Sequence, residues 1–303
     1  MRLVDLLGWL PAWREAGWRE ITPEQYAEAW SRFGGSVMTH PQVIERLSRL
    51  ADIPVRYLGL DENGLQGAAI ATWDGHLALS KDVLKRRGKK RLFDLGHAEI
   101  IFPVSPAARF ELRFRGGFIS EKHAAQIGGL IAQQDAVALL RSPEDYRGKF
   151  LYNQRRELRK FQEQGGRVES VAGMSPEQLA EIYAQLFCLR WGFEAPGKKN
   201  LAEVFSLLRE FMTGSVLFVD QTPVAVQVLY RVESPEWVSV EYVNGGVDPA
   251  FEHLSPGSVL TFLNTQAAWE DARRLGKALR YSFGRADRDY KMRWCSPVPV
   301  YRC

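Results

Sequence analysis

The chain has 303 residues, of which 46% are hydrophobic and 25% charged, and its formal net charge is +4. At about 150 residues per domain, this is the composition of a folded protein of two domains, which excludes intrinsic disorder. The three distant cysteines, the lack of a CxxC pair and the short apolar runs exclude a disulfide scaffold, a structural zinc site and a membrane-spanning helix. Reduced thiols indicate a cytoplasmic setting.

The first twenty residues are rich in Trp and Leu. They do not resemble a secretory signal, because Asp5 interrupts the apolar run and no small-residue cleavage site follows. These residues either pack on the protein or lie peripherally on a membrane surface, and both readings stay open.

The sequence of the first half predicts helices and short strands. Thr22-Pro-Glu-Gln25 is a capping box and begins a helix that ends at Gly34-Gly35, and Pro41 begins a second helix. The apolar runs 55–60 and 67–73 flank an Asn-Gly pair, which is typical of a β-hairpin. Strands are expected at 98–104 and 136–140, with a helix at 121–133 between them.

A basic helix is expected to link two halves. Ser142-Pro-Glu-Asp145 predicts its start and Gly165-Gly166 its end, which gives an N-terminal domain at 1–141, a linker helix at 142–165 and a C-terminal domain at 166–303. A second basic cluster, from Lys81 to Arg91, holds seven positive charges and one acid. Both clusters suit an anionic partner such as tRNA, a nucleotide-sugar or acidic lipid, or they are solvated surface.

The second half has a clearer order of elements. A strand at 167–171 precedes helices at 175–190 and 201–212, and strands follow at 215–219, 224–232 and 236–243. Asn244-Gly-Gly246 is expected to break the last of these, before a helix from Ser255 to Leu275 and a strand at 278–283. This order resembles the α+β fold of the GCN-five-related N-acetyltransferases (GNAT). With a looser copy in the first half, it predicts two GNAT-like domains in tandem, of the acyl-CoA N-acyltransferase type.

Three motifs carry a more specific resemblance. The segment from Lys149 to Lys160 is similar to the entry helix of tandem-GNAT transferases. Leu254-Ser-Pro-Gly-Ser-Val-Leu260 resembles their SPGxxL turn, and the segment from Tyr281 to Trp294 resembles their terminal signature D-F-x-R-G-D-x-x-Y-K-x-x-W. Ser282 and Ala286 depart from that signature, where Asp and Gly are usual.

That superfamily includes the CelD-like proteins and the Fem aminoacyltransferases. Within it, the whole chain most resembles the macrophage-inducible-gene-fourteen (Mig-fourteen) family of Gram-negative bacteria. The resemblance implies an envelope factor for resistance to cationic antimicrobial peptides, associated with the inner membrane.

The helix after Ser255-Pro-Gly-Ser258 predicts an anion site. Unpaired N–H groups and the positive end of the helix dipole meet there, and Gly257 lets a ligand approach the backbone. We expect Ser255, Gly257 and Ser258 to hold the acyl donor. The usual acetyl-CoA loop R/Q-x-x-G-x-G/A is absent, which disfavours acyl-CoA, and a simple capped helix start is the alternative.

Four residues after the last predicted strand are the candidate catalytic group. Amide formation needs an unprotonated amine, oxyanion stabilisation and a proton for the leaving oxygen. Lys291 or Arg285 suits the oxyanion, Asp287 the amine, and Tyr290 the leaving hydroxyl; an ion-paired turn is the alternative. Candidate substrate-binding residues are Lys149, Asn153, Arg155, Arg156 and Glu241.

Two functions follow. The first is transfer of an acyl or aminoacyl group to an amine of an envelope glycolipid, such as an amino sugar of the lipopolysaccharide core. Aminoacyl-tRNA is the expected donor, as the resemblance to the Fem relatives implies. The second is a non-catalytic, membrane-associated binding protein. No metal site and no DNA-reading helix-turn-helix is indicated.

Overall fold

From residue 14 on, where the description of the chain begins, a small sheet with three helices forms the N-terminal part of the protein. The computed structural model describes residues 14–62 and 65–303. The sheet runs in the order β1-β2-β3-β4 and is antiparallel throughout. Its strands are β1 (Arg19–Glu20), β2 (Arg56–Glu62), β3 (Leu65–Trp73) and β4 (His76–Leu77), and the helices are α2 (Pro23–Phe33), α3 (Pro41–Ala51) and α4 (Lys81–Arg86).

The local sequence signals of this part are confirmed. Thr22 and Gln25 form the reciprocal capping box of α2, and Gly34 ends the helix at a φ of 78°. The β2–β3 hairpin forms as expected, although its Asn-Gly turn lies outside the described residues. The N-terminal Trp-rich segment also lies largely outside them, but Trp18 is buried against Phe110.

Two predicted elements of the first half are wrong. The stretch 98–104 is extended but makes only isolated bridges, at Ile100 and Val104. Side chains satisfy part of its backbone, because the Ile101 and Phe102 N–H groups donate to Ser36 Oγ and His123 Nε2, whereas the Ile100 N–H donates to the Phe118 carbonyl. The stretch 121–133 holds a 3-10 turn, a two-residue strand and the start of a long strand in place of a helix.

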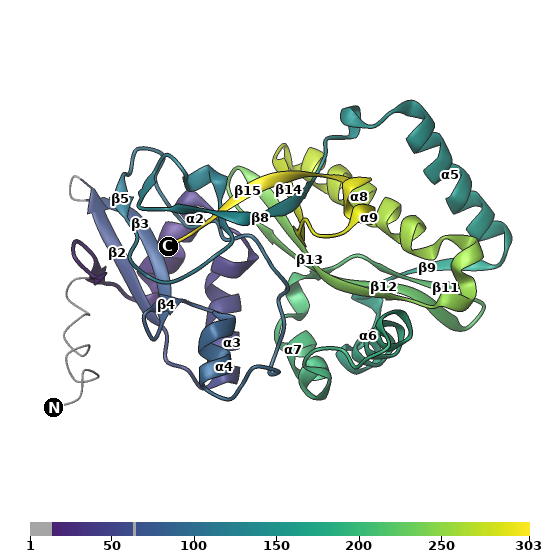
Figure 1. Ribbon diagram of the computed structural model, residues 1–303, viewed down its shortest axis with the longest axis horizontal. Helices are drawn as coiled ribbons and strands as arrows, with labels where there is room; N and C mark the ends of the chain where they lie inside the picture. The colour runs from purple at the N-terminus through teal and green to yellow at the C-terminus, as the bar shows by residue number, and fades with distance from the viewer. Residues whose placement is uncertain (1–13, 63–64) are drawn as a thin grey trace.

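One large sheet dominates the rest of the molecule. Its order is β6-β15-β8-β14-β13-β12-β11-β9, with β10 beside β12. Helices α5 and α8 cover one face and α6 and α7 the other (Figure 1). The strands are β6 (Ile119–Ser120), β8 (Ile131–Leu140), β9 (Gly166–Ser170), β10 (Met212–Thr213), β11 (Ser215–Val219), β12 (Thr222–Glu233), β13 (Trp237–Val247), β14 (Ala278–Arg285) and β15 (Cys295–Arg302); β5 (Phe110–Glu111) and β7 (Ile127–Gly128) pair separately.

The helices on this sheet start mostly where the sequence predicts. They are α5 (Gly148–Glu163), α6 (Pro176–Trp191), α7 (Leu201–Leu207), α8 (Pro256–Leu275) and the short α9 (Asp289–Met292). Helix α5 begins later than expected, because Ser142-Pro-Glu-Asp145 forms a separate 3-10 turn. The predicted helix 201–212 is shorter, since a second 3-10 turn follows α7. None of the described helices is both long and apolar enough to span a membrane.

The two predicted halves share the large sheet. Strand β8 belongs to the first half by sequence, yet it lies between β14 and β15. Strand β15 was not expected, because Pro297 and Pro299 interrupt its pattern. The domain boundaries at 141 and 165 stay a prediction. Any description of two domains has to account for β8, which precedes the first boundary but lies in the sheet of the second half.

Candidate functional site

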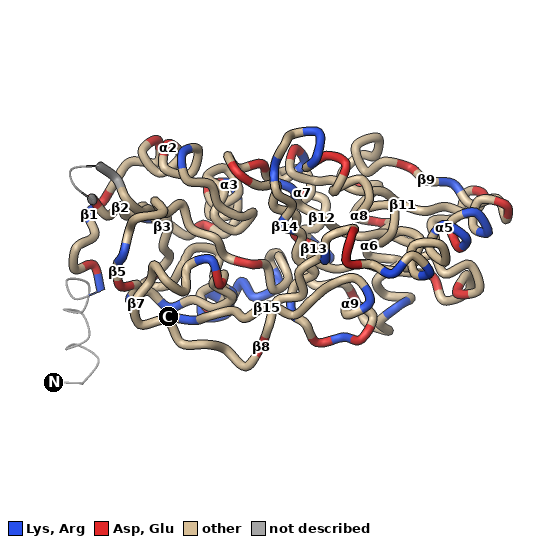
Figure 2. Tube along the Cα trace, turned by 90° about the horizontal axis from the view of Figure 1, so that it is seen from above, with Lys and Arg blue, Asp and Glu red and all other residues tan. Residues whose placement is uncertain are grey.

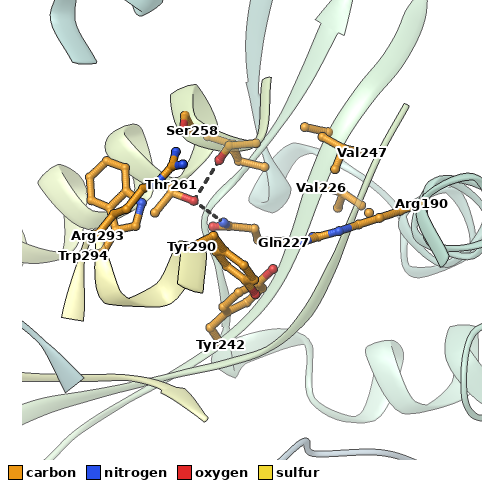
Figure 3. Close-up of a pocket in the computed structure, with 14 residues that line it drawn as sticks. Arg190, Val226, Gln227, Tyr242, Val247, Ser258, Thr261, Tyr290, Arg293 and Trp294 are labelled. Atoms are coloured by element: carbon orange, nitrogen blue, oxygen red, sulfur yellow. Dashed lines mark hydrogen bonds between the residues drawn. The ribbon is translucent and has the colours of Figure 1, made fainter. Parts of the chain in front are cut away.

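A pocket of about 160 Å³ opens between the sheet and the first turn of α8. Strands β12 and β13 form its floor, and the end of α6 and the segment around α9 form its sides (Figure 3). The residues that line it are Arg190, Ala225, Val226, Gln227, Tyr242, Gly246, Val247, Gly257, Ser258, Leu260, Thr261, Tyr290, Arg293 and Trp294.

An irregularity in β13 shapes the pocket floor. The predicted break at Asn244-Gly-Gly246 is wrong, since β13 continues to Val247, but the register with β12 shifts between Val228 and Leu229. Both glycines are needed for close packing. A Cβ on Gly245 would lie 2.7 Å from Tyr242 Oη, and a Cβ on Gly246 would lie 2.3 Å from the backbone of α6.

The start of α8 brings unpaired backbone N–H groups to the pocket. Pro256 has no N–H, and the N–H groups of Gly257 and Ser258 have no carbonyl partner within the helix. Both residues line the pocket, as the sequence predicts for a donor site. Ser255 does not line it: this residue is the N-cap, with a φ of 50° and no capping hydrogen bond from its side chain.

Two arginines give the pocket a positive character. Arg190 at the end of α6 donates weakly to the Gly245 carbonyl, at 3.4 Å, and lies against the ring of Tyr290, 5.4 Å from its centroid. Arg293 follows α9 and pairs with no acid among the described residues. No carboxylate belongs to the lining described above. The pocket therefore suits a phosphate, a carboxylate or a developing oxyanion.

Two phenols face each other across the pocket. Tyr242 comes from β13 and Tyr290 from α9, and Figure 3 shows their rings close together. Burial raises the pKa of Tyr290 well above its usual range, neighbouring Tyr242 adds to this effect, and Arg190 offsets it in part. Tyr290 is therefore protonated at neutral pH and can donate a hydrogen bond.

A buried polar chain supports one wall. Asn264 Nδ2 donates to Gln227 Oε1 at 2.8 Å, and Gln227 Nε2 donates to Thr261 Oγ1 at 2.9 Å. Thr261 then donates to the Gly257 carbonyl at 2.8 Å. Because Gln227 Oε1 accepts one hydrogen bond and Nε2 donates another, the orientation of this amide at the pocket wall is fixed.

The structure separates the four candidate catalytic residues. Only Tyr290 lines the pocket. Lys291 Nζ donates to the Arg285 carbonyl at 2.6 Å and to Asp287 Oδ1 at 3.1 Å, and the Arg285 guanidinium pairs with Asp135 at 2.7 Å. Burial acts to lower the pKa of Lys291, and Asp287 opposes it. These contacts stabilise the turn that carries Tyr290, as the ion-paired alternative predicts. A catalytic role for Lys291, Asp287 and Arg285 stays a prediction.

Glu241 lies on the opposite side of the sheet from Tyr242. The residue is 2% exposed, and its Oε1 accepts the N–H of Glu99 at 3.2 Å. Glu99 is also buried and binds the Arg280 guanidinium with both carboxylate oxygens, and Arg280 binds Glu121 as well. Burial raises the pKa of Glu241 well above its usual range, and Glu99 adds to this effect. Glu241 therefore joins the two halves and does not reach the pocket.

The remaining candidates lie on α5. Lys149, Asn153, Arg155 and Arg156 do not line the pocket, and three of the four are exposed. The helix still contributes to the site, because Phe150 packs edge-on against Trp294, at 5.0 Å between ring centroids. Tyr146, just before α5, donates to the Trp294 carbonyl at 2.5 Å.

Several pocket residues were missed from the sequence. Gln227 is a lone polar residue in the apolar run of β12, which was an available signal. Arg190 and Arg293 gave no such signal, since each is one of many arginines. Among the described residues, no group of His, Cys, Asp and Glu is arranged to hold a metal ion.

Comparisons with known proteins assign the chain to a family. A family model described as Mig-14 matches residues 40–303. FemX matches at 10% identity with a TM-score of 0.54, covering 94% of this chain and 96% of FemX. A protein of unknown function from Bacteroides thetaiotaomicron VPI-5482 matches at 13% identity with a TM-score of 0.51, covering 94% and 98%.

A tandem GNAT protein from the clavulanic acid biosynthesis pathway matches at 9% identity with a TM-score of 0.43, covering 94% of this chain and 96% of that protein. A search among curated proteins found no match. The α+β, GNAT-like fold predicted from the sequence is confirmed.

Proposed function

The chain belongs to the Mig-14 family, and from this membership and the pocket at α8 we propose that it transfers an acyl or aminoacyl group to an amine. The observation that carries the proposal is the set of donors in one pocket. Arg190, Arg293, Tyr290 and the first turn of α8 all offer hydrogen bonds, and no acid of the lining competes for them. Such a site favours the negative charge that develops on a carbonyl oxygen under attack.

The donor in this proposal is a polyanion carrying an activated ester, and aminoacyl-tRNA fits best. The two guanidiniums and the α8 N–H groups suit a phosphate next to the ester. Acyl-CoA is the less favoured donor, because the loop that usually cradles its pyrophosphate is absent from the sequence.

The proposed reaction is aminolysis of an ester. The unprotonated amine attacks the ester carbonyl, a C–N bond forms, and the carbonyl oxygen becomes an oxyanion that Arg190 and the Gln227 amide can stabilise. The tetrahedral intermediate then collapses, the C–O bond to the donor breaks, and Tyr290 gives its proton to the departing alkoxide. An alkoxide is more basic than an ordinary phenolate, whose parent pKa is about 10, and the burial that raises the pKa of Tyr290 narrows this difference. The proton that the amine releases passes to water or back to Tyr290.

The proposed acceptor is an amine of an envelope glycolipid, such as an amino sugar of the lipopolysaccharide core. A plain acyl group removes the positive charge of the acceptor amine, whereas an aminoacyl group brings its own α-ammonium; either product alters the surface that cationic antimicrobial peptides meet. The proposed location is cytoplasmic, with peripheral contact to the inner membrane.

The test is a transfer assay with purified protein. The reaction contains total tRNA charged with one ¹⁴C-labelled amino acid at a time and a lipopolysaccharide-core precursor, and a parallel reaction contains ¹⁴C-acetyl-CoA. Label in the glycolipid that depends on charged tRNA, and that Tyr290→Phe abolishes, is the expected result. No label with any standard amino acid, or label only from acetyl-CoA, contradicts the donor assignment.

One observation favours a second candidate, a non-catalytic binding protein. Lys291, Asp287 and Arg285 are engaged in the turn, so most of the predicted catalytic group is not available to a substrate. A binding protein keeps its effect on peptide resistance in the Tyr290→Phe variant, whereas an enzyme loses it. Complementation of a deletion strain with this variant separates the two.

A further inference from the structure

A strip of cations and aromatic rings, half-buried at Arg190 and Trp191 and otherwise exposed, leads away from the pocket; we call it the cationic strip. It starts at Arg190, whose Cζ lies 4.7 Å from the ring centroid of Trp191. Arg288 lies over the same indole, at 5.7 Å. The Trp191 Nε1 donates to the Gly245 carbonyl at 3.3 Å, which fixes the ring beside the pocket floor. The strip comprises Lys90, Arg91, Arg190, Trp191, Phe193, Lys198, Lys199 and Arg288.

The far end of the strip joins two basic segments that are distant in sequence. Asn200 Nδ2 donates to the Arg91 carbonyl at 3.5 Å, and Lys198 pairs with Glu194 at 2.9 Å. The Lys198 hydrogen bond and charge lower the pKa of Glu194, and Arg91 and Lys199 contribute further. Glu194 is thus surrounded by several cations, which leaves this end of the strip positive. Figure 2 shows the basic stretches beside α7.

Aromatic rings alternate with these charges. The Phe193 residue is 57% exposed and touches Phe187 edge-on, at 5.4 Å between ring centroids. Such a ring beside cations is typical of single-stranded nucleic-acid sites, where bases stack on aromatic rings and the phosphates meet Lys and Arg. A lipid surface is less well matched, because Arg190 and Glu194 interrupt the apolar residues Leu189 and Phe193.

We propose that the cationic strip binds the single-stranded, phosphate-bearing end of a polynucleotide and directs it into the pocket. The inference rests on the proposed function, because it assigns the route of the polynucleotide donor to that same pocket. It also gives a role to part of the basic run from Lys81 to Arg91. Other cations of that run are already paired, since Lys81 binds Asp94 and Arg87 binds Asp74.

The test is fluorescence anisotropy with a 5′-fluorescein-labelled, 12-nucleotide single-stranded RNA, and with the same RNA as a duplex. We expect preference for the single strand and an affinity that falls with salt, by about 0.7 in log–log slope for each phosphate contact. The triple variant Arg91→Ser/Lys198→Ser/Lys199→Ser is expected to lower that slope by about two. Phe193→Ser is expected to weaken binding by about 5- to 150-fold, the effect of removing one stacked base.

Matched controls remove similar groups elsewhere. Tyr152→Ser removes the aromatic ring of a residue that is also 57% exposed, but on α5. Arg32→Ser/Arg49→Ser/Arg274→Ser removes three exposed charges from other surfaces. Neither control is expected to change RNA binding by more than about twofold.

The outcomes separate this inference from the proposed function. Equal losses in the control variants, or no preference for the single strand, overturn the strip as the binding surface even if transfer occurs. RNA binding that depends on the strip supports it even if no transfer is found.

A sedimentation assay uses vesicles of phosphatidylglycerol and phosphatidylethanolamine to test for lipid binding. If Phe193→Ser abolishes vesicle binding and leaves RNA binding intact, the surface is a lipid site and the inference is wrong.

Discussion

Replacing Arg280 by Met tests whether the buried ion cluster holds the two halves together. The Arg280 side chain is 15% exposed and neutralises Glu99, whose side chain is 1% exposed, while also binding Glu121. Removing one partner of a buried pair leaves an uncompensated charge and typically costs about 3–5 kcal/mol. At about 2–3 °C per kcal/mol for a chain of this size, we expect the melting temperature to fall by roughly 6–15 °C.

The assay is thermal unfolding followed by circular dichroism, with Arg285→Met as the matched control. The Arg285–Asp135 pair has side chains 44% and 31% exposed, so its loss is expected to cost ~1 kcal/mol or less. Adding Glu99→Gln to Arg280→Met is expected to recover part of the loss, because it removes the unpaired charge. If Arg280→Met melts within 2 °C of Arg285→Met, the cluster does not hold the halves together as we argue.

Four further predictions concern single positions. Glu241 has a folded-state pKa above its ordinary value of 4.5, so its contribution favours folding below that value and is lost as pH rises through the folded-state pKa. Glu241→Gln is therefore expected to lose less stability than the wild type between pH 5 and 8, measured by urea unfolding; parallel pH profiles contradict this. Tyr290→Phe is expected to lower kcat for transfer by about 10²-fold or more with an unchanged melting temperature, and an unaltered kcat refutes its role. Gly246→Ala is expected to destabilise the fold strongly, because its Cβ meets the α6 backbone at 2.3 Å, whereas Gly257→Ala, with 3.7 Å to its nearest contact, should fold normally; equal melting temperatures refute the packing argument. Lys291→Ala is expected to lower the melting temperature and to reduce transfer through displacement of Tyr290; full activity with normal stability removes both roles.

The sequence predicted the elements whose signals are local. The capping box and glycine stop of α2, the start of α6 after Ser175 and the hairpin of β2 and β3 depend on neighbouring residues, and they formed as expected. The stretch 98–104 has a strand-like sequence, but its backbone makes only scattered hydrogen bonds, some to side chains and some to the backbone of distant segments. Strand β15 was missed because Pro297 and Pro299 argue against a strand. Both are tolerated there, since β6 pairs only with Val300 and Tyr301 and leaves the edge beside the prolines uncovered.

The site was predictable only in part, for a similar reason. The α8 turn was found because a helix start after a strand has its own signal, and Gly257 and Ser258 do line the pocket. The catalytic group was chosen by density of charge, and charge density does not distinguish residues that bind one another from residues that face a cavity. Lys291 and Asp287 bind one another, whereas Tyr290 faces the cavity. Arg190 reaches the pocket from a different helix, a placement that depends on how α6 crosses the sheet.

The position of β8 also affects how the chain folds during its synthesis. Both of its neighbours, β14 and β15, follow it by well over a hundred residues, since Ser282 pairs with Leu139 and Cys295 with Leu140. During synthesis on the ribosome, both edges of β8 therefore stay without their final partners until residues 278–302 have emerged. Pairing across such sequence separations is slow, and open strand edges invite association with other chains. This strand contains the polar residues Gln133, Gln134 and Asp135, which lower its tendency to associate with other chains before β14 and β15 have been synthesised. Until the last strand has been made, this polar stretch is therefore what limits association through the open edges of β8.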